Sequence, residues 1–109
     1  MHELSIAQGI VDMVSERSEG RRVVRVVVEI GELAAVLPDA LRFCFGVAAD
    51  GTVADGAALD ILEMPGVARC RGCGGKIPMR RSIVQCSCGS WDLAVVGGQE
   101  LRVREMEVA

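Results

Sequence analysis

The organisation of this chain is decided by residues 66–92, which read GVARCRGCGGKIPMRRSIVQCSCGSWD. The segment holds two short cysteine pairs, Cys70-x-x-Cys73 and Cys86-x-Cys88, with twelve residues between them. Such pairs are typical of two knuckles that clasp a tetrahedral zinc ion through thiolates. The segment has little hydrophobic mass of its own, so we expect it to need a metal to fold. Four thiolates leave no open coordination position, which predicts a structural zinc.

The second cysteine pair departs from a usual knuckle, because only Ser87 separates Cys86 from Cys88. Gln85 stands where a two-residue spacing would put a thiol. Two other interpretations therefore stay open beside ligation by all four cysteines. One is a three-thiolate site with an outside ligand, and the other is a degenerate ribbon without metal.

Upstream of the cysteines, apolar residues recur at helical and then at strand spacing. A capping box at Ser5–Gln8 predicts a helix that runs to about Ser18 and leaves residues 1–3 free before it. Its buried stripe is Leu4, Ala7, Ile10, Val11 and Val14. A strand is predicted over Val23–Ile30, with Val24, Val26, Val28 and Ile30 on one face and Arg25 and Glu29 on the other.

A second helix is predicted from Asp39 to about Ala49, because Pro38 suits its first turn and Gly51 its stop. Leu41, Phe45 and Ala48 would line one side of it. Further strands are predicted over Ala57–Met64, Leu93–Val96 and Leu101–Val108, with Gly97-Gly98 as a turn. The cysteine segment is thus an insertion between strands.

Composition and charge restrict the classes of protein that fit. The chain has 109 residues, half of them hydrophobic, and carries a net charge of -3. Residues 1–65 carry -6 and residues 66–92 carry +4, so the basic charge lies on the cysteine segment. Neither a signal peptide nor a membrane-spanning run is present, so we expect a cytoplasmic protein without membrane insertion. In that reducing compartment the paired cysteines are better read as metal ligands than as disulfides.

The amino-terminal tripeptide Met1-His2-Glu3 holds the chain's only histidine. Bulky His2 predicts that the initiator methionine is retained. The Met1 α-amine, the amide nitrogen of His2 and its imidazole can then close adjacent five- and six-membered chelate rings around one ion. A nitrogen-rich set of this kind favours nickel or copper, and Glu3 could add a carboxylate oxygen. Taken alone, a lone surface histidine without a ligand role remains the simpler interpretation.

The whole chain resembles the HypA family of nickel metallochaperones. The likeness rests on Met1–Ser5, Ile30–Glu32, Leu41–Phe45, the two cysteine pairs and Glu100–Val103. It implies an α+β fold, in which two helices pack on a small, mainly antiparallel sheet and a zinc-ribbon-like four-cysteine subdomain is inserted. The implied domains are a nickel-binding α/β domain over residues 1–65 plus 93–109 and a zinc-binding subdomain over residues 66–92.

The resemblance also implies a function without catalysis. Ni(II) would be carried at His2, with the Met1 amine and Glu3, and Zn(II) would be structural at Cys70, Cys73 and Cys88, with Cys86 displaced from the family pattern. The expected partners are the GTPase HypB and the large subunit of [NiFe]-hydrogenase, and in some organisms urease maturation proteins. The oligomeric state, monomer or homodimer, is not specified by these features.

Two other classes of protein fit the sequence less well. A zinc-ribbon module that binds nucleic acid or a protein fits the basic stretch, but the chain is acidic overall and nearly without aromatic residues for stacking. An enzyme fits poorly, because the single histidine is terminal and a closed thiolate zinc activates no water. Arg69, Arg71, Arg80 and Arg81 would either steer an acidic partner or solvate the zinc subdomain. Cys44, on the second helix, is predicted to be a buried core thiol.

Overall fold

The computed structural model describes residues 2–80 and 83–109, and the chain divides into two compact units. The first unit comprises Met1–Glu29, Val36–Leu62 and Arg102–Ala109, and the second comprises Ile30–Ala35 and Glu63–Leu101. Among the described residues, no helix has the length and apolar character needed to cross a membrane.

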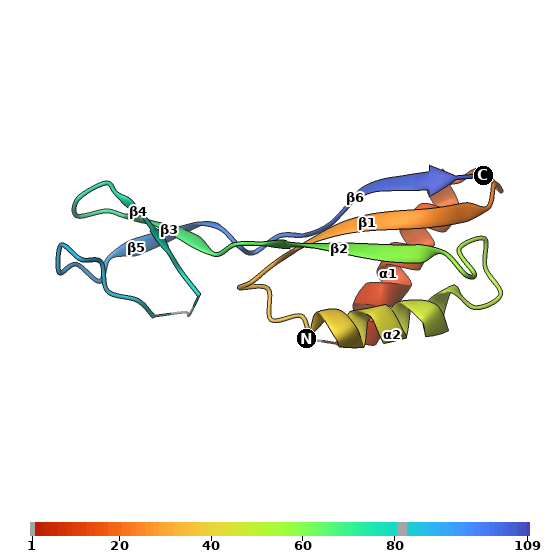
Figure 1. The fold of residues 1–109 in the computed structure, drawn as a ribbon, viewed down its shortest axis with the longest axis horizontal. Helices are drawn as coiled ribbons and strands as arrows, with labels where there is room; N and C mark the ends of the chain where they lie inside the picture. Colours follow the sequence, from red (N-terminus) through yellow and green to blue (C-terminus); the bar gives the residue numbers. More distant parts are fainter. Residues whose placement is uncertain (1, 81–82) are drawn as a thin grey trace. The chain divides into compact units, whose positions relative to one another are not determined.

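The first unit is a helical layer on a three-stranded sheet. Helices α1 (Glu3–Arg17) and α2 (Pro38–Ala49) pack against each other and lie on the same face of the sheet (Figure 1). The helices bury the apolar residues that recur at helical spacing, which are Ala7, Ile10, Val11, Val14, Leu41, Phe45 and Ala49. Full burial of each large aliphatic side chain contributes about 1.5–3 kcal/mol, so this layer forms the unit's core.

The sheet of this unit has the strand order β2-β1-β6. Its strands are β1 (Val23–Gly31), β2 (Ala58–Met64) and β6 (Leu101–Val108). The backbone bond from Ala109 N–H to Arg22 O joins the end of β6 to the start of β1, so these strands are antiparallel. β1 and β2 run in the same direction, and helix α2 lies in the crossover connection that joins such parallel strands (Figure 1). The sheet is therefore mixed.

The second unit is built on a smaller antiparallel sheet in the order β4-β3-β5. Its strands are β3 (Val67–Cys70), β4 (Lys76–Pro78) and β5 (Leu93–Gly97). Strands β3 and β4 were not predicted from the sequence, because each is too short to show a period. β5 pairs with β3, so residues 93–101 belong to the cysteine unit, whereas the sequence pattern groups them with the first domain.

The start of α1 differs from the prediction. The helix begins at Glu3, with His2 as its N-cap, and Ser5 is not a cap. Gln8 does not reach back to the helix start, because its side-chain amide donates to Asp12 at 2.9 Å. An acidic residue in the first turn interacts favourably with the helix dipole, and Glu3 extends the helix in this way. The capping-box prediction left residues 1–3 free before the helix, and this was wrong for Glu3, which is the first residue of α1.

The predicted buried faces hold with exceptions. Leu4 is 53% exposed, and near the end of α2 Ala49 is buried whereas Ala48 is half-buried. In β1 the strict alternation fails, because Val24 is exposed while Val27 and Glu29 are buried. The Glu29 carboxylate is held by Arg102 Nε and lies 4.0 Å from Arg104 Nη1, so β6 supplies the partners that permit its burial.

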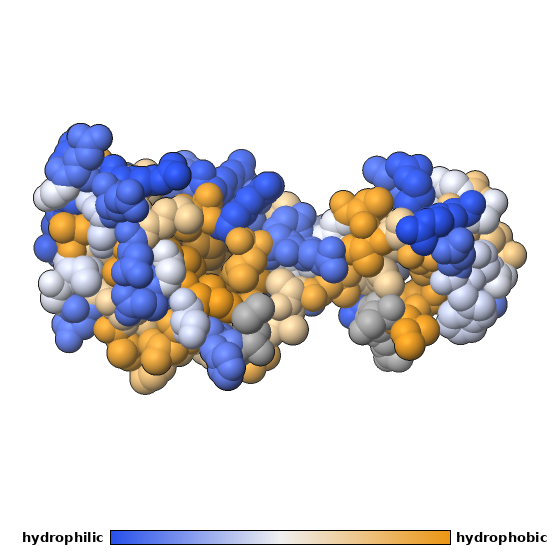
Figure 2. Space-filling view, turned by 180° about the vertical axis from the view of Figure 1, so that it is seen from behind, coloured by the Kyte–Doolittle hydropathy of each residue, from blue (hydrophilic) through white to orange (hydrophobic). Residues whose placement is uncertain are grey.

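Apolar side chains also reach the surface of the first unit. In Figure 2 they gather along the lower edge of the first unit, the edge at which Figure 1 shows helix α2. The exposed large apolar residues of α1, α2 and the α2 N-cap are Leu4, Met13, Leu37, Phe43 and Val47.

Candidate metal centres

The first cysteine knuckle follows directly from strand β3. Cys70 is the last residue of the strand, and its carbonyl accepts a 2.7 Å hydrogen bond from Gly74 N–H. The Cys70 N–H in turn donates to Gly75 O at 2.8 Å, which closes the loop. Gly74 has φ +76, a left-handed conformation that an L side chain disfavours. The loop therefore turns the second thiol, that of Cys73, back toward the first.

The second knuckle has the same construction with one residue fewer. Gly89 N–H donates to Cys86 O at 2.9 Å, and Cys86 N–H donates to Ser90 O at 2.9 Å. Gly89 directly follows the second cysteine and has φ +94, a left-handed conformation like that of Gly74 in the first knuckle. Gln85 closes the loop from outside through a 2.9 Å bond from its side-chain amide to Gly89 O. The short Cys-x-Cys spacing is thus accommodated by a tighter turn.

The four cysteine sulfurs come together between the two knuckles. Cys70 Sγ lies 3.6 Å from Cys88 Sγ, and Cys73 Sγ lies 3.7 Å from Cys86 Sγ. All four sulfurs are within 4.8 Å of one another, and none forms a disulfide. A tetrahedron with zinc–sulfur bonds of 2.3 Å has sulfur–sulfur edges of about 3.8 Å. The donor set and its spacing therefore fit a tetrahedral thiolate metal centre.

The four clustered thiols differ in exposure and in acidity. Cys70 and Cys86 are buried, whereas Cys73 and Cys88 are exposed. Hydrogen bonding to the backbone amides of Cys73 and Gly72 lowers the pKa of Cys70 to about 6. The Ser90 amide lowers the pKa of Cys88, but hydrogen bonds shared with the Cys86 and Cys70 thiols outweigh it and raise this pKa to about 11. A preformed thiolate at Cys70 favours capture of a cation.

The amino-terminal tripeptide lies at the start of α1. Met1 is outside the described residues. His2 is exposed, its side chain makes no capping hydrogen bond, and its carbonyl accepts from Ile6 N–H at 3.1 Å. Glu3 Oε2 accepts a 3.2 Å hydrogen bond from the backbone N–H of Leu37, the N-cap of α2. This bond lowers the pKa of Glu3, so its carboxylate is already engaged by the protein.

Of the remaining residues from the sequence analysis, Arg69 and Arg71 have partners within the cysteine unit. Arg69 Nη1 donates to Gly74 O at 3.1 Å, and Arg71 Nη1 forms a 2.7 Å ion pair with Asp92. Arg80 is exposed and Arg81 is outside the described residues. Cys44 is half-buried rather than a fully buried core thiol, because its position on α2 is at the edge of the buried face.

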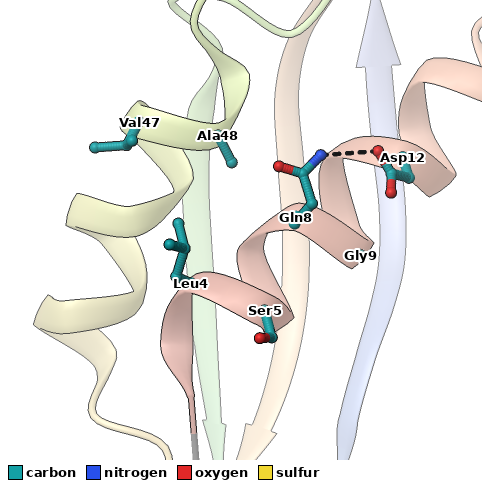
Figure 3. A pocket seen from close by; sticks show the side chains of 7 residues that line it. All are labelled: Leu4, Ser5, Gln8, Gly9, Asp12, Val47 and Ala48. Carbon is teal, nitrogen blue, oxygen red and sulfur yellow. Dashed lines mark hydrogen bonds between the residues drawn. The ribbon is translucent and has the colours of Figure 1, made fainter.

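An open groove between α1 and α2 was not anticipated from the sequence. Figure 3 shows its lining, which is Leu4, Ser5, Gln8, Gly9 and Asp12 from α1 and Val47 and Ala48 from α2. Its one carboxylate and one amide are bonded to each other, so the groove offers no metal-ligand set. Within residues 2–80 and 83–109, the four cysteines are the one cluster of three or more ligand-type side chains that could share an ion.

Comparison with known proteins matches the chain over nearly its full length. A family profile described as "Hydrogenase/urease nickel incorporation, metallochaperone, hypA" matches residues 1–108. The chain is 49% identical to "Hydrogenase maturation factor HypA" of Nostoc punctiforme, with 99% of this chain and 96% of that protein covered. It is 46% identical to the protein of the same name from Geobacter sulfurreducens, with 99% of each covered.

Solved structures support the fold. A "Solution structure of HypA protein" aligns with a TM-score of 0.70 at 24% identity and covers 100% of this chain and 97% of the other. A "Solution structure of the Ni metallochaperone HypA from Helicobacter pylori" aligns with a TM-score of 0.66 at 23% identity and covers 99% of this chain and 97% of the other. The α+β fold with a four-cysteine unit is therefore confirmed.

Proposed function

This chain belongs to the HypA family of nickel metallochaperones for hydrogenase maturation, which are not enzymes, and on that premise we propose that it binds Ni(II) at Met1-His2-Glu3 and delivers it to [NiFe]-hydrogenase. The observation that carries the proposal is the family match from residue 1 together with an exposed His2 whose side chain makes no capping bond. The imidazole is accordingly available to a ligand.

The helix start supplies a second argument for this nickel site. The first amides of a helix have no intrahelical acceptor, so the His2 amide nitrogen is not committed to the α1 hydrogen-bond pattern. With the Met1 α-amine and the imidazole it makes the nitrogen-rich set that favours a square-planar ion such as Ni(II). Glu3 has one carboxylate oxygen on Leu37 N–H, and its other oxygen is the candidate for a further ligand.

The zinc centre has a separate, structural role in this proposal. Cys70, Cys73, Cys86 and Cys88 would hold Zn(II) with no open position, and the zinc would link the two knuckles of a unit whose strands are three to five residues long. The spacing of the four sulfurs favours this reading over the three-thiolate and metal-free alternatives.

The partners and compartment follow from the family. The nickel would pass, with the GTPase HypB, to the hydrogenase large subunit, and urease maturation proteins are a second possible destination in organisms that have them. We place the protein in the cytoplasm, where free thiols such as these four persist. The nucleic-acid-binding alternative gains no support, because Arg69 and Arg71 already have intramolecular partners.

The replacement His2→Ala tests the nickel site. We expect stoichiometric nickel binding to be lost in calorimetry, while zinc content and the helical circular dichroism stay unchanged, because the sites use separate residues. Cys44→Ser is the matched control, since it removes a soft ligand outside both sites and should bind nickel as the wild type does. Equal nickel uptake by His2→Ala and Cys44→Ser would show that the imidazole is not a ligand.

A further inference from the structure

Two charged residues that are not themselves candidate metal ligands connect one knuckle to the other. Arg71 lies between the two cysteines of the first knuckle, and Asp92 lies four residues beyond the last cysteine of the second. Their backbones are joined by a 2.9 Å bond from Arg71 N–H to Asp92 O, and their side chains by the 2.7 Å bond from Arg71 Nη1 to Asp92 Oδ1. The two loops are therefore linked twice by protein groups alone.

This link continues the pairing of β3 with β5. In that ladder Arg69 is opposite Ala94 and Cys70 is opposite Leu93, so Arg71 and Asp92 form the next cross-strand pair. A pair of opposite charges at such a position stabilises the local register of the two strands. The ladder thereby extends past Cys70, the first metal-binding thiol, into the loop that carries Cys73.

The turn beyond the second knuckle is fitted to the same contact. Ser90 Oγ accepts a 3.1 Å hydrogen bond from Asp92 N–H, which fixes the backbone that presents the Asp92 carboxylate. A Cβ on Gly72 would lie 3.2 Å from Ser90 Cβ, so the two loops are already in close contact there. The residues that follow the second knuckle, Ser90 to Asp92, are thus held against the loop between Cys70 and Cys73.

We propose that Arg71 and Asp92 are positioning residues for the metal centre, which hold the two knuckles in register around the ion and so slow its loss. This inference rests on the proposed zinc role of the four cysteines. The two ligands it protects are Cys73 and Cys88, which are exposed and through which a competing chelator would approach. Preorganised outer contacts of this kind tune metal retention without touching the ion.

The expected effect on the rate of zinc release is small, because the Arg71–Asp92 ion pair is exposed to water. The side chains of Arg71 and Asp92 are 60% and 65% exposed, so salt screens their attraction. Exposed ion pairs measured by double-mutant cycles correspond to a roughly two- to five-fold change in an equilibrium or rate. We therefore expect Arg71→Gln and Asp92→Asn each to release zinc about two- to five-fold faster to a chromophoric chelator at low salt.

Three controls separate positioning from loss of charge or fold. Lys76→Gln removes a cation from the same sheet without touching the pair, and should release zinc at the wild-type rate. The double variant Arg71→Gln/Asp92→Asn should be no faster than either single variant, and the exchanged pair Arg71→Asp/Asp92→Arg should recover most of the wild-type rate. The advantage of the wild type should shrink in high salt.

The outcomes distinguish this inference from the zinc assignment. Zinc is first counted by elemental analysis of each variant, and one zinc per chain in all of them with equal release rates would overturn the positioning role alone. A double variant whose effect is the sum of the single effects would also overturn it. Wild-type protein purified without zinc, and unable to take up zinc or cobalt, would overturn the zinc assignment and this inference with it.

Discussion

The replacement of Gly31 by alanine tests a very close approach of two backbone segments in the second unit. A Cβ on Gly31 would lie 1.9 Å from the carbonyl oxygen of Gly98 and 2.6 Å from the amide nitrogen of Gln99. Carbon and oxygen ordinarily approach to roughly 3.3 Å, so the two segments must separate by more than about 1 Å. Both contacts are with backbone atoms, and no side-chain rotation can relieve them.

The separation acts on two hydrogen bonds beside the contact. Gly31 N–H donates to Glu100 O and Leu33 N–H donates to Gly98 O, each at 2.7 Å. Stretching both beyond bonding distance costs about 1–3 kcal/mol, and the overpacking itself costs about 1–3 kcal/mol. We therefore expect Gly31→Ala to lower the free energy of unfolding by about 2–6 kcal/mol in sum, a large share of the roughly 5–15 kcal/mol typical of a domain.

The matched control is the same substitution at Gly46, in the interior of α2. A Cβ there meets no atom within 4 Å, so Gly46→Ala should raise the free energy of unfolding by about 1 kcal/mol through helix propensity alone. The assay is urea denaturation of zinc-loaded protein, followed by circular dichroism. Wild-type stability in Gly31→Ala, or an equal loss in Gly46→Ala, would refute the packing argument.

Three further predictions concern the metal sites. Cys86→Ser should weaken zinc binding by more than about 10-fold in a chelator competition, since even contacts outside the ligand shell are worth that much; unchanged affinity would favour the three-thiolate site. In metal-free protein whose circular dichroism still matches that of the zinc-loaded protein, the thiolate ultraviolet absorbance should rise first near pH 6 for Cys70 and last near pH 11 for Cys88. Because folding lowers the pKa of Cys70, the Cys70 thiolate adds to the free energy of unfolding fully above pH 9, the ordinary pKa of a thiol, and this contribution is lost as the pH falls through 6. Ionisation of all the thiols near pH 9 would contradict this. Glu3→Ala should speed hydrogen exchange at the Leu37 amide, and Glu3→Gln, which keeps an acceptor, should do so less; equal exchange in wild type and Glu3→Ala would exclude the bond between them.

The regular elements of the first unit could be predicted because their periods are long and unbroken. Helical spacing located the buried face of α1 at Ala7, Ile10 and Val14, and alternation located β6 at Leu101–Val108. The start of α1 could not be predicted, because Glu3 is held by Leu37, 34 residues away in the sequence. The burial of Glu29 likewise depends on arginines of β6, which no local pattern reveals.

In the second unit, the cysteine spacing predicted the cluster but not the frame around it. Strands β3 and β4 have four and three residues, too few for alternation to be visible, and they exist because they pair with each other. The tie from Arg71 to Asp92 follows from strand register, which becomes known only when β5 is seen to pair with β3. The charge pattern of residues 66–92 alone therefore suggested a surface for an acidic partner, whereas the structure gives Arg69 and Arg71 partners within the unit.

The role of the Met1 amine as a nickel ligand can be tested by comparing nickel binding to protein with a free amino terminus and to protein that carries a Gly-Ser extension ahead of Met1. The extension converts the Met1 amine into an amide and leaves every side chain in place. We expect one Ni(II) per chain for the free terminus and an affinity at least about 10-fold weaker for the extended protein, with zinc content equal in both. Equal nickel affinity in the two proteins would contradict this expectation.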